Sequence, residues 1–278
     1  MHELRQQFAL PGLLKLAALP RSTFYYRHNA SLRNDKHAQL KADIQAIYAR
    51  HRGRYGYRRI TAVVRQSGRL VNHKLVQRLM SQLGLKSLVR PKRYRSYKGE
   101  LGKVAANVLK RQFKSERPNQ KWVTDVTEFK VAGEKLYLSP VLDLYNGEIV
   151  AYQTARRPEL AMVSAMLKKA MKKLNKDDAP LLHSDQGWQY QMSAYQRLLR
   201  QRRIKQSMSR KGNCLDNAAM ESFFGTLKSE LFHLQKFASI DHLDTAIRDY
   251  IHYYNNDRIK LKLKGLSPVQ YRTQPSLT

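Results

Sequence analysis

Residues 122–155, WVTDVTEFKVAGEKLYLSPVLDLYNGEIVAYQTA, contain three runs rich in β-branched and aromatic residues. Turn-forming residues separate the runs: Gly133 lies between the first two, and Asn146-Gly147 is a strong hairpin signal between the last two. The strands that this pattern predicts are 122–131, 135–145 and 148–155. Three consecutive strands joined by short turns indicate the antiparallel part of a sheet.

The chain after residue 155 alternates between the periods of helices and strands. The elements that these periods predict are a helix at 159–174, a strand at 181–185, a helix at 195–203, a short strand at 204–209, and long helices at about 217–234 and 240–255. Strands that alternate with amphipathic helices favour an α/β layer.

Three acidic residues stand in unusual settings within this region. Asp125 interrupts the first strand, Asp185 ends the strand at 181–185, and Glu221 lies in the helix at 217–234. An ionised carboxylate in a buried strand costs several kcal/mol unless a cation or donor compensates it. The compensation that we infer is divalent metal. Two Mg²⁺ ions held ~3.5–4 Å apart can activate a water or hydroxyl and stabilise the oxygen that leaves a phosphodiester.

The helix at 217–234 places a carboxylate and an ammonium on one face. At about 100° per residue, Glu221, Phe224, Gly225 and Lys228 share a face with Asn217. Glu221 would complete the metal site, and Lys228 would hold a phosphate beside it. An ordinary exposed Glu and Lys on an amphipathic helix gives the same spacing, so spacing alone leaves both interpretations open.

The charge of the chain predicts a polyanionic partner. Its 278 residues include 52 Lys and Arg but only 21 Asp and Glu, a net charge of +31. Residues 1–117 hold 27 basic and 5 acidic residues (+22), whereas 118–278 hold 25 and 16 (+9). No acid stands between Asp43 and Glu100, where there are 15 Lys or Arg. We therefore expect the front of the chain to bind DNA.

Residues 35–90 are predicted to form a helix-turn-helix DNA-binding domain. Apolar spacing indicates three helices, at 37–51, 58–66 and 72–83, although any basic three-helix bundle would have the same pattern. Residues 1–34 contain two further short helices and form a second, weaker helix-turn-helix-like candidate. The basic residues of the 35–90 domain that we expect on the DNA are Arg58, Arg59, Lys74 and Arg78.

Residues 91–117 lose helical periodicity and are predicted to be a basic linker. We expect Lys92, Arg93 and Arg95 to contact phosphates there; a tether that touches nothing specific is the alternative. Cys214, the sole cysteine, excludes an internal disulfide and a Cys-rich zinc site. The chain has no run of 18 apolar residues and no signal-type N-terminus, which predicts a cytoplasmic, nucleoid-associated protein with no membrane partner.

Three motifs resemble one known family. They are WVTDVT at 122–127, HSDQGWQY at 183–190 and SRKGNCLDNAAMESFFGTLK at 209–228, with 35 residues between Asp185 and Glu221. Together they are similar to the second-frame product of bacterial two-frame insertion sequences, a DDE integrase-type transposase. YGYRRI at 55–60 resembles the helix-turn-helix module of that family, and YIHYYNNDRIKLKLKGLSPVQYR at 250–272 resembles its C-terminal signature.

The resemblance implies an α/β ribonuclease-H-like catalytic core, shared with retroviral integrases, at 118–278, preceded by all-α helix-turn-helix modules. By the same resemblance, Asp125, Asp185 and Glu221 are the catalytic residues and bind two Mg²⁺ or Mn²⁺ ions. Lys228 matches the basic residue seven positions after the glutamate. The implied activity is that of a metal-dependent polynucleotidyl transferase.

The implied reaction is transposition of DNA. The protein would bind the terminal inverted repeats of its element, cleave a strand at each end to free a 3′-hydroxyl, and use that hydroxyl to attack target DNA. Two ends must be held together, so a homodimer or larger assembly on double-stranded DNA is expected. A ribonuclease-H-like nuclease without joining activity and a non-catalytic DNA-binding regulator are the alternatives.

Three other residues are secondary candidates. His183 either orients the site, contacts a phosphate, or is a satisfied structural histidine. Asn217 either caps its helix or contacts DNA. Arg258 either binds DNA or belongs to a helix end that packs on the core.

Overall fold

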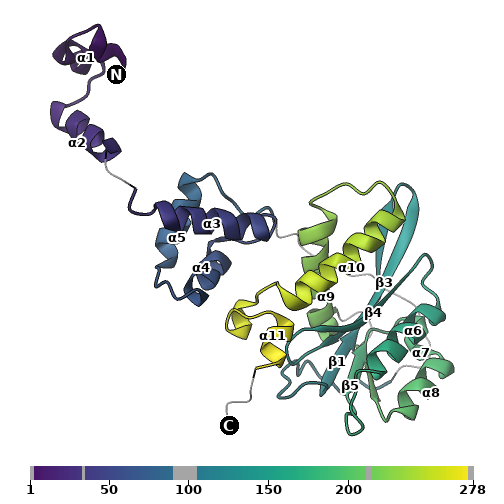
Figure 1. The fold of residues 1–278 in the computed structure, drawn as a ribbon. Helices are drawn as coiled ribbons and strands as arrows, with labels where there is room; N and C mark the ends of the chain where they lie inside the picture. The colour runs from purple at the N-terminus through teal and green to yellow at the C-terminus, as the bar shows by residue number, and fades with distance from the viewer. Residues whose placement is uncertain (1–2, 33–34, 90–104, 211–213, 275–278) are drawn as a thin grey trace.

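The computed structural model describes residues 3–32, 35–89, 105–210 and 214–274 of the chain. Lys92, Arg93 and Arg95, the phosphate contacts predicted in the linker, lie outside these residues. From residue 105 onward the described chain forms an α/β layer, and two small helical modules precede it (Figure 1).

One mixed sheet organises the α/β layer. Its strands are β1 (Lys121–Thr124), β2 (Thr127–Val131), β3 (Glu134–Asp143), β4 (Ile149–Ala155), β5 (Leu181–Ser184) and β6 (Lys205–Met208). β3 pairs antiparallel with β1, β2 and β4, whereas β5 lies parallel to both β1 and β6. The predicted strands are therefore present, and the sheet has an antiparallel half and a parallel half.

The strand expected at 122–131 is divided in two at Asp125 and Val126. Trp122 pairs with Asp143 and Thr127 with Leu138, so the register continues across the break and sets Asp125 opposite Pro140. Proline has no backbone N–H to donate, which removes a ladder bond at this position. The interruption follows from Pro140 in the neighbouring strand, and it lies where the first acidic residue stands.

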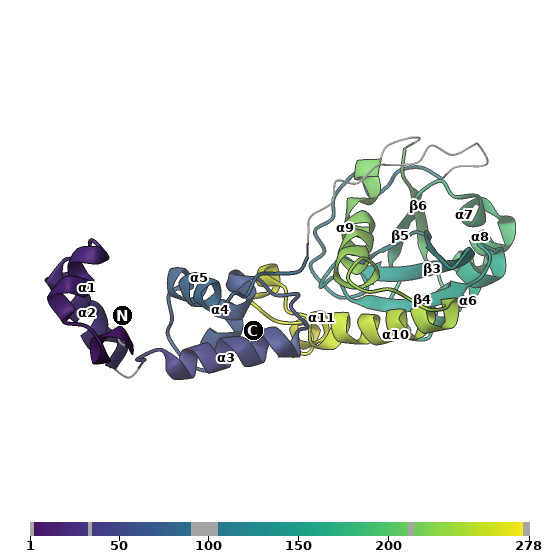
Figure 2. The same ribbon diagram turned by 90° about the horizontal axis from the view of Figure 1, so that it is seen from above.

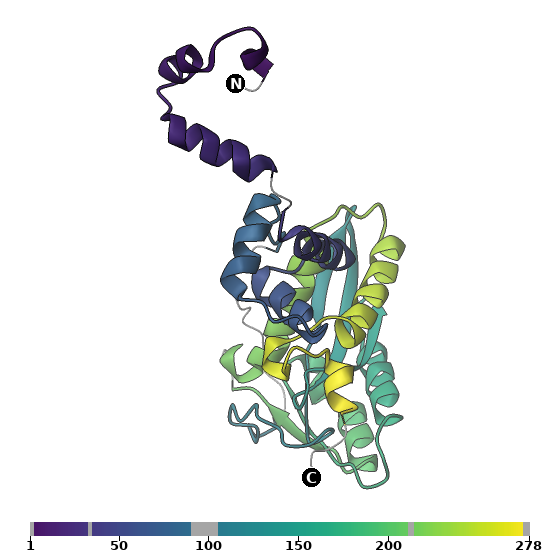
Figure 3. The ribbon, with the colours of Figure 1, turned by 60° about the vertical axis from the view of Figure 1, so that its left-hand side comes forward.

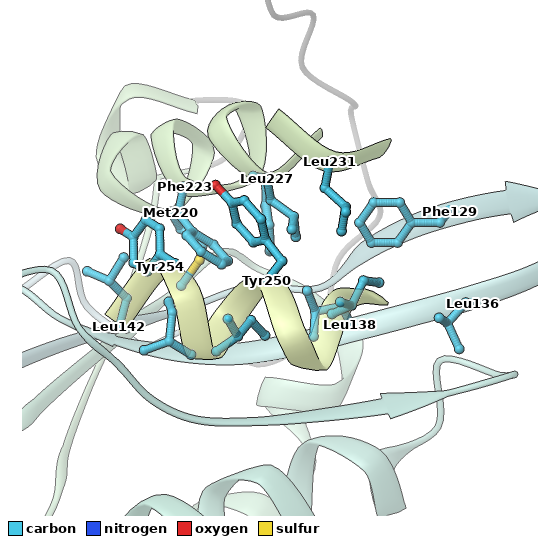
Figure 4. Close-up of a cluster of buried hydrophobic side chains, with 14 of the residues drawn as sticks. Phe129, Leu136, Leu138, Leu142, Met220, Phe223, Leu227, Leu231, Tyr250 and Tyr254 are labelled. Carbon is cyan, nitrogen blue, oxygen red and sulfur yellow. The ribbon is translucent and has the colours of Figure 1, made fainter. Parts of the chain in front are cut away.

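Helices cover both faces of the sheet. On one face lie α6 (Leu160–Met171), α7 (Trp188–Gln191) and α8 (Ser193–Gln201). On the other lie α9 (Ala218–Leu227), its π-helical continuation η3 (Lys228–Phe232) and α10 (Ile240–Asn256), preceded by the 3₁₀ turn η2 (Cys214–Asn217). Figure 4 shows Phe223 and Leu227 of α9 packed with Tyr250 and Tyr254 of α10 over β3. Burial of these side chains fixes α9 and α10 against this face of the sheet.

The expected helix at 217–234 changes from α-helical to π-helical at Lys228. α9 ends at Leu227, and residues Lys228–Phe232 are π-helical, with wider turns than the α-helix that the spacing assumed. Phe224, expected on the face of Glu221, is buried in the core instead.

The helix-turn-helix candidate at 35–90 forms three helices with a core of their own. They are α3 (Ala38–Arg50), α4 (Tyr57–Gln66) and α5 (His73–Gln82). Asn72 caps α5 as its sequence suggested, since its Oδ1 accepts a hydrogen bond from Lys74 N at 2.9 Å. Gly53, Gly68 and Gly84 follow the three helices with positive φ, the conformation that ends helices readily.

The first helical module stands apart from the rest of the chain. It consists of η1 (Glu3–Gln6), α1 (Leu10–Leu16) and α2 (Arg21–Leu32). Figures 2 and 3 show it beyond α3–α5, on the side away from the sheet. In the described parts of the chain no helix is both long and apolar enough to cross a bilayer.

Residues 105–117, which the sequence places in the linker, pack on the core. Val108 N and Leu109 N both donate to Ser207 Oγ of β6, at 2.9 and 3.1 Å, and the Leu109 side chain is buried. This part of the segment is therefore an edge of the α/β layer.

The C-terminal helix α11 (Pro268–Arg272), which the sequence analysis did not predict, anchors the β3–β4 hairpin. Arg272 lies 2.6 Å from Asp143 and 2.5 Å from Glu148, measured between guanidinium nitrogens and carboxylate oxygens. Asp143 also accepts hydrogen bonds from Asn119 N and Tyr145 N. Asp143 is thus a buried anchor with a turn hydrogen bond, and an arginine from the end of the chain compensates its charge.

We predict that Arg272→Ala lowers the free energy of unfolding by about 3 kcal/mol, because it leaves Asp143 buried without its cationic partner. Arg248→Ala is the matched control, since it breaks an exposed pair with Asp244 on α10 and should cost less than ~1 kcal/mol. Urea unfolding followed by circular dichroism measures both. Equal losses in the two variants would contradict the anchoring role of α11.

Candidate active site

Two of the three acidic residues meet where adjacent parallel strands end. β1 and β5 are neighbours, with Val123 opposite His183. Two residues further along each strand, this register aligns Asp125 with Asp185. Carboxyl ends of parallel strands are where open α/β sheets place their ligand sites.

Asp125 points to the face of the sheet that carries α9. Val123, two residues earlier, packs in the cluster with α9 and α10, and side chains two apart in a strand share a face. The carboxylate turns back on its own chain, because Val126 N donates to Asp125 Oδ1 at 2.7 Å. Val126 lies between β1 and β2, outside both strands.

Asp185 is held by the turn that follows β5. Gly187 N donates to Asp185 Oδ1 at 2.9 Å, and a Cβ at Gly187 would approach that oxygen to 3.0 Å. The glycine therefore lets the backbone lie against the carboxylate. The next residue, Trp188, opens the short helix α7 and is 53% exposed. The sequence analysis quoted this tryptophan within a motif but gave it no role.

His183 is a structural residue in this arrangement. It is fully buried, and its ring nitrogens lie 2.8 Å from Ser207 Oγ and 3.1 Å from Ser209 Oγ. Burial lowers the pKa of His183 to about 4. Of the interpretations left open for this residue, the geometry favours the satisfied histidine, which ties β5 to β6 beneath Asp185.

Glu221 lies in the first turn of α9, and Asn217 holds the start of that helix to β1. Asn217 Nδ2 donates to Thr124 O at 3.3 Å, and its side chain makes no helix-cap hydrogen bond. The residue is 3% exposed, and its Oδ1 has no hydrogen-bond partner among the residues described. Asn217 therefore joins the helix of Glu221 to the strand of Asp125, a role that neither interpretation of the sequence included.

Asp216 fixes the segment ahead of α9. Its buried carboxylate accepts from Arg210 Nε at 3.0 Å, Arg111 Nε at 2.8 Å and Asn107 Nδ2 at 2.9 Å. Hydrogen bonding to Arg210 is the largest cause that holds the pKa of Asp216 well below its usual value.

The three candidate carboxylates lack such compensation. Asp125, Asp185 and Glu221 are half-buried, and none forms an ion pair within the described chain, whereas the buried acids Asp143, Asp216 and Glu230 each pair with arginine.

Burial is the largest cause that raises the pKa of each of the three carboxyls above its usual value. The negative charges of Asp185 and Glu221 raise the pKa of Asp125 further. Each of the three is therefore harder to ionise than a free carboxyl unless a cation arrives.

Lys228 is half-buried rather than solvent-facing. Its Nζ lies 5.3 Å from the centre of the Phe129 ring. Burial lowers the pKa of Lys228, and the negative charges of Glu128 and Asp125 oppose that change. The ammonium thus lies within the electrostatic reach of Asp125, on the side of the site formed by η3.

The donor set fits a hard divalent cation. Carboxylate oxygens are the ligands that Mg²⁺ prefers, and none of these three carboxylates forms an ion pair within the described chain. In the described residues no three His, Cys, Asp or Glu side chains are close enough to enclose an ion. Asp125, Asp185 and Glu221 are therefore not gathered around one ion position in this structure.

The residues expected on DNA divide into two groups. Lys74 and Arg78 are exposed and lie one turn apart on α5, and Arg58 is exposed at the start of α4. Arg59 instead lies 3.4 Å from the buried carboxylate of Glu230, measured from Nη1 to Oε1.

For Arg258 the geometry favours packing on the core over contact with DNA. It is buried, and its Nε and Nη2 donate to the two oxygens of Glu230 at 2.7 and 2.6 Å. The sequence analysis missed Glu230 itself. Its position between Leu227 and Leu231 on the apolar side of the helix was the available signal of a buried acid.

Comparisons with known families cover nearly all of the chain. Residues 115–214 and 221–275 match models described as integrase core domain, and residues 34–93 match a model described as HTH-like domain. The chain is 58% identical over 274 residues to the putative transposase InsK for insertion sequence element IS150 of Escherichia coli, covering 99% of this chain and 97% of InsK.

A second relative and a solved structure extend these matches. The transposase InsF for insertion sequence IS3A of Escherichia coli is 30% identical over 274 residues, covering 96% of this chain and 95% of InsF. A chain of the simian T-cell lymphotropic virus intasome, solved by cryoEM in complex with PP2A regulatory subunit B56 gamma, superposes with a TM-score of 0.50. That match covers 84% of this chain and 76% of the other at 15% identity, which shows a shared fold.

We predict that Asp125→Asn raises the melting temperature of the metal-free protein by about 2–4 °C, the shift that ~1 kcal/mol gives a domain of this size. The folded-state pKa of Asp125 lies above that of the unfolded chain, so ionisation of this carboxyl opposes folding. This cost is absent at low pH and grows as the pH rises from the unfolded-state pKa towards the folded-state pKa. Asparagine retains an acceptor for Val126 N without the charge.

Mg²⁺ should reverse the order of the melting temperatures of the wild type and Asp125→Asn. Added Mg²⁺ should raise the melting temperature of the wild type and leave that of Asp125→Asn unchanged, because binding to the folded state alone stabilises it. Asp177→Asn, at an exposed acid, serves as the control and should melt and respond to Mg²⁺ as the wild type does. A wild-type melting temperature indifferent to Mg²⁺ would count against a metal site at Asp125.

Proposed function

The chain belongs to the IS3 family of insertion-sequence transposases with an integrase core domain, and from this membership we propose that it carries out both chemical steps of transposition. It binds the terminal inverted repeats of its element and cleaves a strand to free a 3′-hydroxyl. It then joins that hydroxyl to a phosphodiester of target DNA. One active site, formed by Asp125, Asp185 and Glu221, serves both steps.

The observation that carries this proposal is the set of three carboxylates without a cation. The chain has a net charge of +31, and its buried acids elsewhere are paired with arginine. Divalent ions that arrive with the substrate would explain why three half-buried carboxylates form no ion pair in so basic a protein.

Asp125, Asp185 and Glu221 would hold Mg²⁺ or Mn²⁺, and we propose two ions per site. Two ions ~3.5–4 Å apart supply activation of the attacking oxygen and stabilisation of the leaving oxygen. The protein's own residues position the DNA. Asn217 keeps Glu221 beside Asp125, and Lys228 offers a positive charge to a phosphate next to them. Trp188 presents an exposed ring on which an unpaired base can stack.

Double-stranded DNA is the proposed partner of the front of the chain. Residues 1–117 carry +22 of the net charge, and Lys74 and Arg78 project from α5, the second helix of the helix-turn-helix pair α4–α5. In such motifs the second helix enters the major groove. Joining needs two element ends in one complex, so we propose that a homodimer or larger assembly forms on DNA.

The two alternatives differ from transposition in their products. A nuclease with the same site would release a nicked end and never join it to target DNA. A non-catalytic regulator would bind the ends without cutting them. Such a regulator has no need of the acidic site, yet Asp125, Asp185 and Glu221 are all present in this chain.

We predict that Asp125→Asn, Asp185→Asn and Glu221→Gln each lower cleavage and joining by at least ~10³-fold, because each removes a charged metal ligand while nearly preserving shape. Binding to end DNA should persist in all three. Incubation of the purified chain with labelled terminal-repeat DNA, target plasmid and Mg²⁺ separates the candidate functions. Joined products support transposition, nicked ends alone support a nuclease, and intact DNA supports a regulator.

We also predict that Lys74→Ala/Arg78→Ala weakens binding to end DNA and flattens the salt dependence by about two units of log slope, one for each phosphate that the double variant no longer neutralises. The matched control is Lys168→Ala/Lys172→Ala, two exposed lysines one turn apart on and just after α6. Titrations at several salt concentrations measure the slopes. If both variants flatten the slope equally, α5 is not the recognition surface.

A further inference from the structure

Glu230 links the helical segment α9–η3, here called the catalytic helix because it contains Glu221, to the rest of the core. It lies in η3, nine residues after Glu221 on the same continuous helical segment, and is 2% exposed. Its carboxylate accepts both guanidinium bonds of Arg258 and a hydrogen bond from Tyr250 OH at 2.9 Å. π-Helical turns are rare and are frequent at functional sites. Here the π-helical turn contains both Lys228, near the acidic site, and Glu230.

The helix-turn-helix module reaches this same residue with two arginines. Arg59 Nη1 lies 3.4 Å from Glu230 Oε1, and Arg54 Nε donates to the backbone oxygen of Glu230 at 3.0 Å. The Arg54 guanidinium also lies over two rings of α10, 5.3 Å from the centre of Tyr250 and 4.7 Å from that of Tyr253. All of these contacts cross from the module to the core.

Further buried contacts surround the two arginines. Tyr55 OH accepts from Ile259 N at 2.9 Å and donates to Asp257 O at 3.3 Å. The His51 ring stacks on Tyr55 and lies 3.1 Å from Tyr253 OH. Figures 2 and 3 show α3–α5 lying against the end of α10 and the turn that follows it.

The contact between the helix-turn-helix module and the core favours one relative position of the two. Arg54 is 7% exposed, and a buried charge that leaves its partners costs several kcal/mol. Modules joined by small polar surfaces usually move relative to each other. The buried guanidinium of Arg54, with a hydrogen-bond acceptor and two aromatic rings, instead holds the module in one position. Its acceptor, the backbone oxygen of Glu230, lies on the helical segment that contains Glu221.

We propose that Arg54 and Arg59 are positioning residues that lock the DNA-recognition module onto the catalytic helix. The protein thereby fixes the distance along the DNA between the recognised sequence and the phosphodiester that meets Asp125, Asp185 and Glu221. This inference rests on the proposed function. It also reassigns Arg59, which the sequence analysis placed on DNA, while its exposed neighbour Arg58 keeps that role.

The test compares two double variants with equal loss of charge. Arg54→Ala/Arg59→Ala removes the two docking arginines, and Arg52→Ala/Lys86→Ala removes two exposed basic residues of the same module. Substitution on the module side is chosen because Glu230→Ala would leave Arg258 buried without its partner and threaten the fold. Circular dichroism verifies that both full-length variants are folded.

The first readout is the position of the cut on terminal-repeat DNA with Mg²⁺. The wild type and the Arg52/Lys86 variant should cut at one phosphodiester. The docking variant should spread its cuts over neighbouring phosphodiesters and lose at least ~10-fold in rate at the original one. A docking variant that cuts at the single wild-type position would overturn the inference.

The second readout does not depend on chemistry. In an Asp125→Asn background, hydroxyl-radical footprinting should show protection of both the recognised sequence and the terminal base pairs. The docking variant should keep the protection of the recognised sequence and lose the protection of the terminal base pairs. Unchanged protection of both would overturn this inference and leave the proposed function standing. A wild type that neither cuts nor protects the ends would instead remove the proposed function and, with it, this inference.

Discussion

The placement of three half-buried carboxylates that form no ion pair is the constraint on which the rest of the structure depends. Asp125 and Asp185 stand side by side because β1 and β5 are parallel neighbours, and Pro140 interrupts the ladder where Asp125 turns towards Val126 N. Asn217 then ties the helix of Glu221 to the same strand. Burial and the neighbouring charges of Asp185 and Glu221 raise the pKa of Asp125, whereas the hydrogen bond from Val126 N lowers it. A divalent cation would remove the cost of ionising the three carboxyls.

Other buried acids show how the same chain treats charge when no substrate is involved. Asp143 and Glu230 are fully buried, and an arginine far away in sequence pairs with each of them. The Arg272–Asp143 pair holds the C-terminal helix to the β3–β4 hairpin. The Arg258–Glu230 pair lies where the helix-turn-helix module contacts the core. The contrast between paired and unpaired acids separates the structural residues of this protein from its candidate active site.

Local periodicity predicted much of the fold. The strands, the three helices of residues 35–90 and the cap at Asn72 follow from signals within about ten residues. The sequence motifs also named Asp125, Asp185 and Glu221, but only the register of β1 with β5 brings the first two together. Features that depend on contacts across the fold were missed or misassigned. Pro140 lies in a different strand from the break it causes, and Arg258 and Arg59 meet Glu230 only after three segments have packed.

The central claim is that Asp125, Asp185 and Glu221 hold two divalent ions between them. Anomalous diffraction from crystals of the chain grown with Mn²⁺ and terminal-repeat DNA tests it most directly. The account predicts two Mn²⁺ peaks ~3.5–4 Å apart, with carboxylate oxygens of all three residues in their coordination shells. Peaks at other acids, such as Glu128 or Asp178, with none at these three, would contradict it.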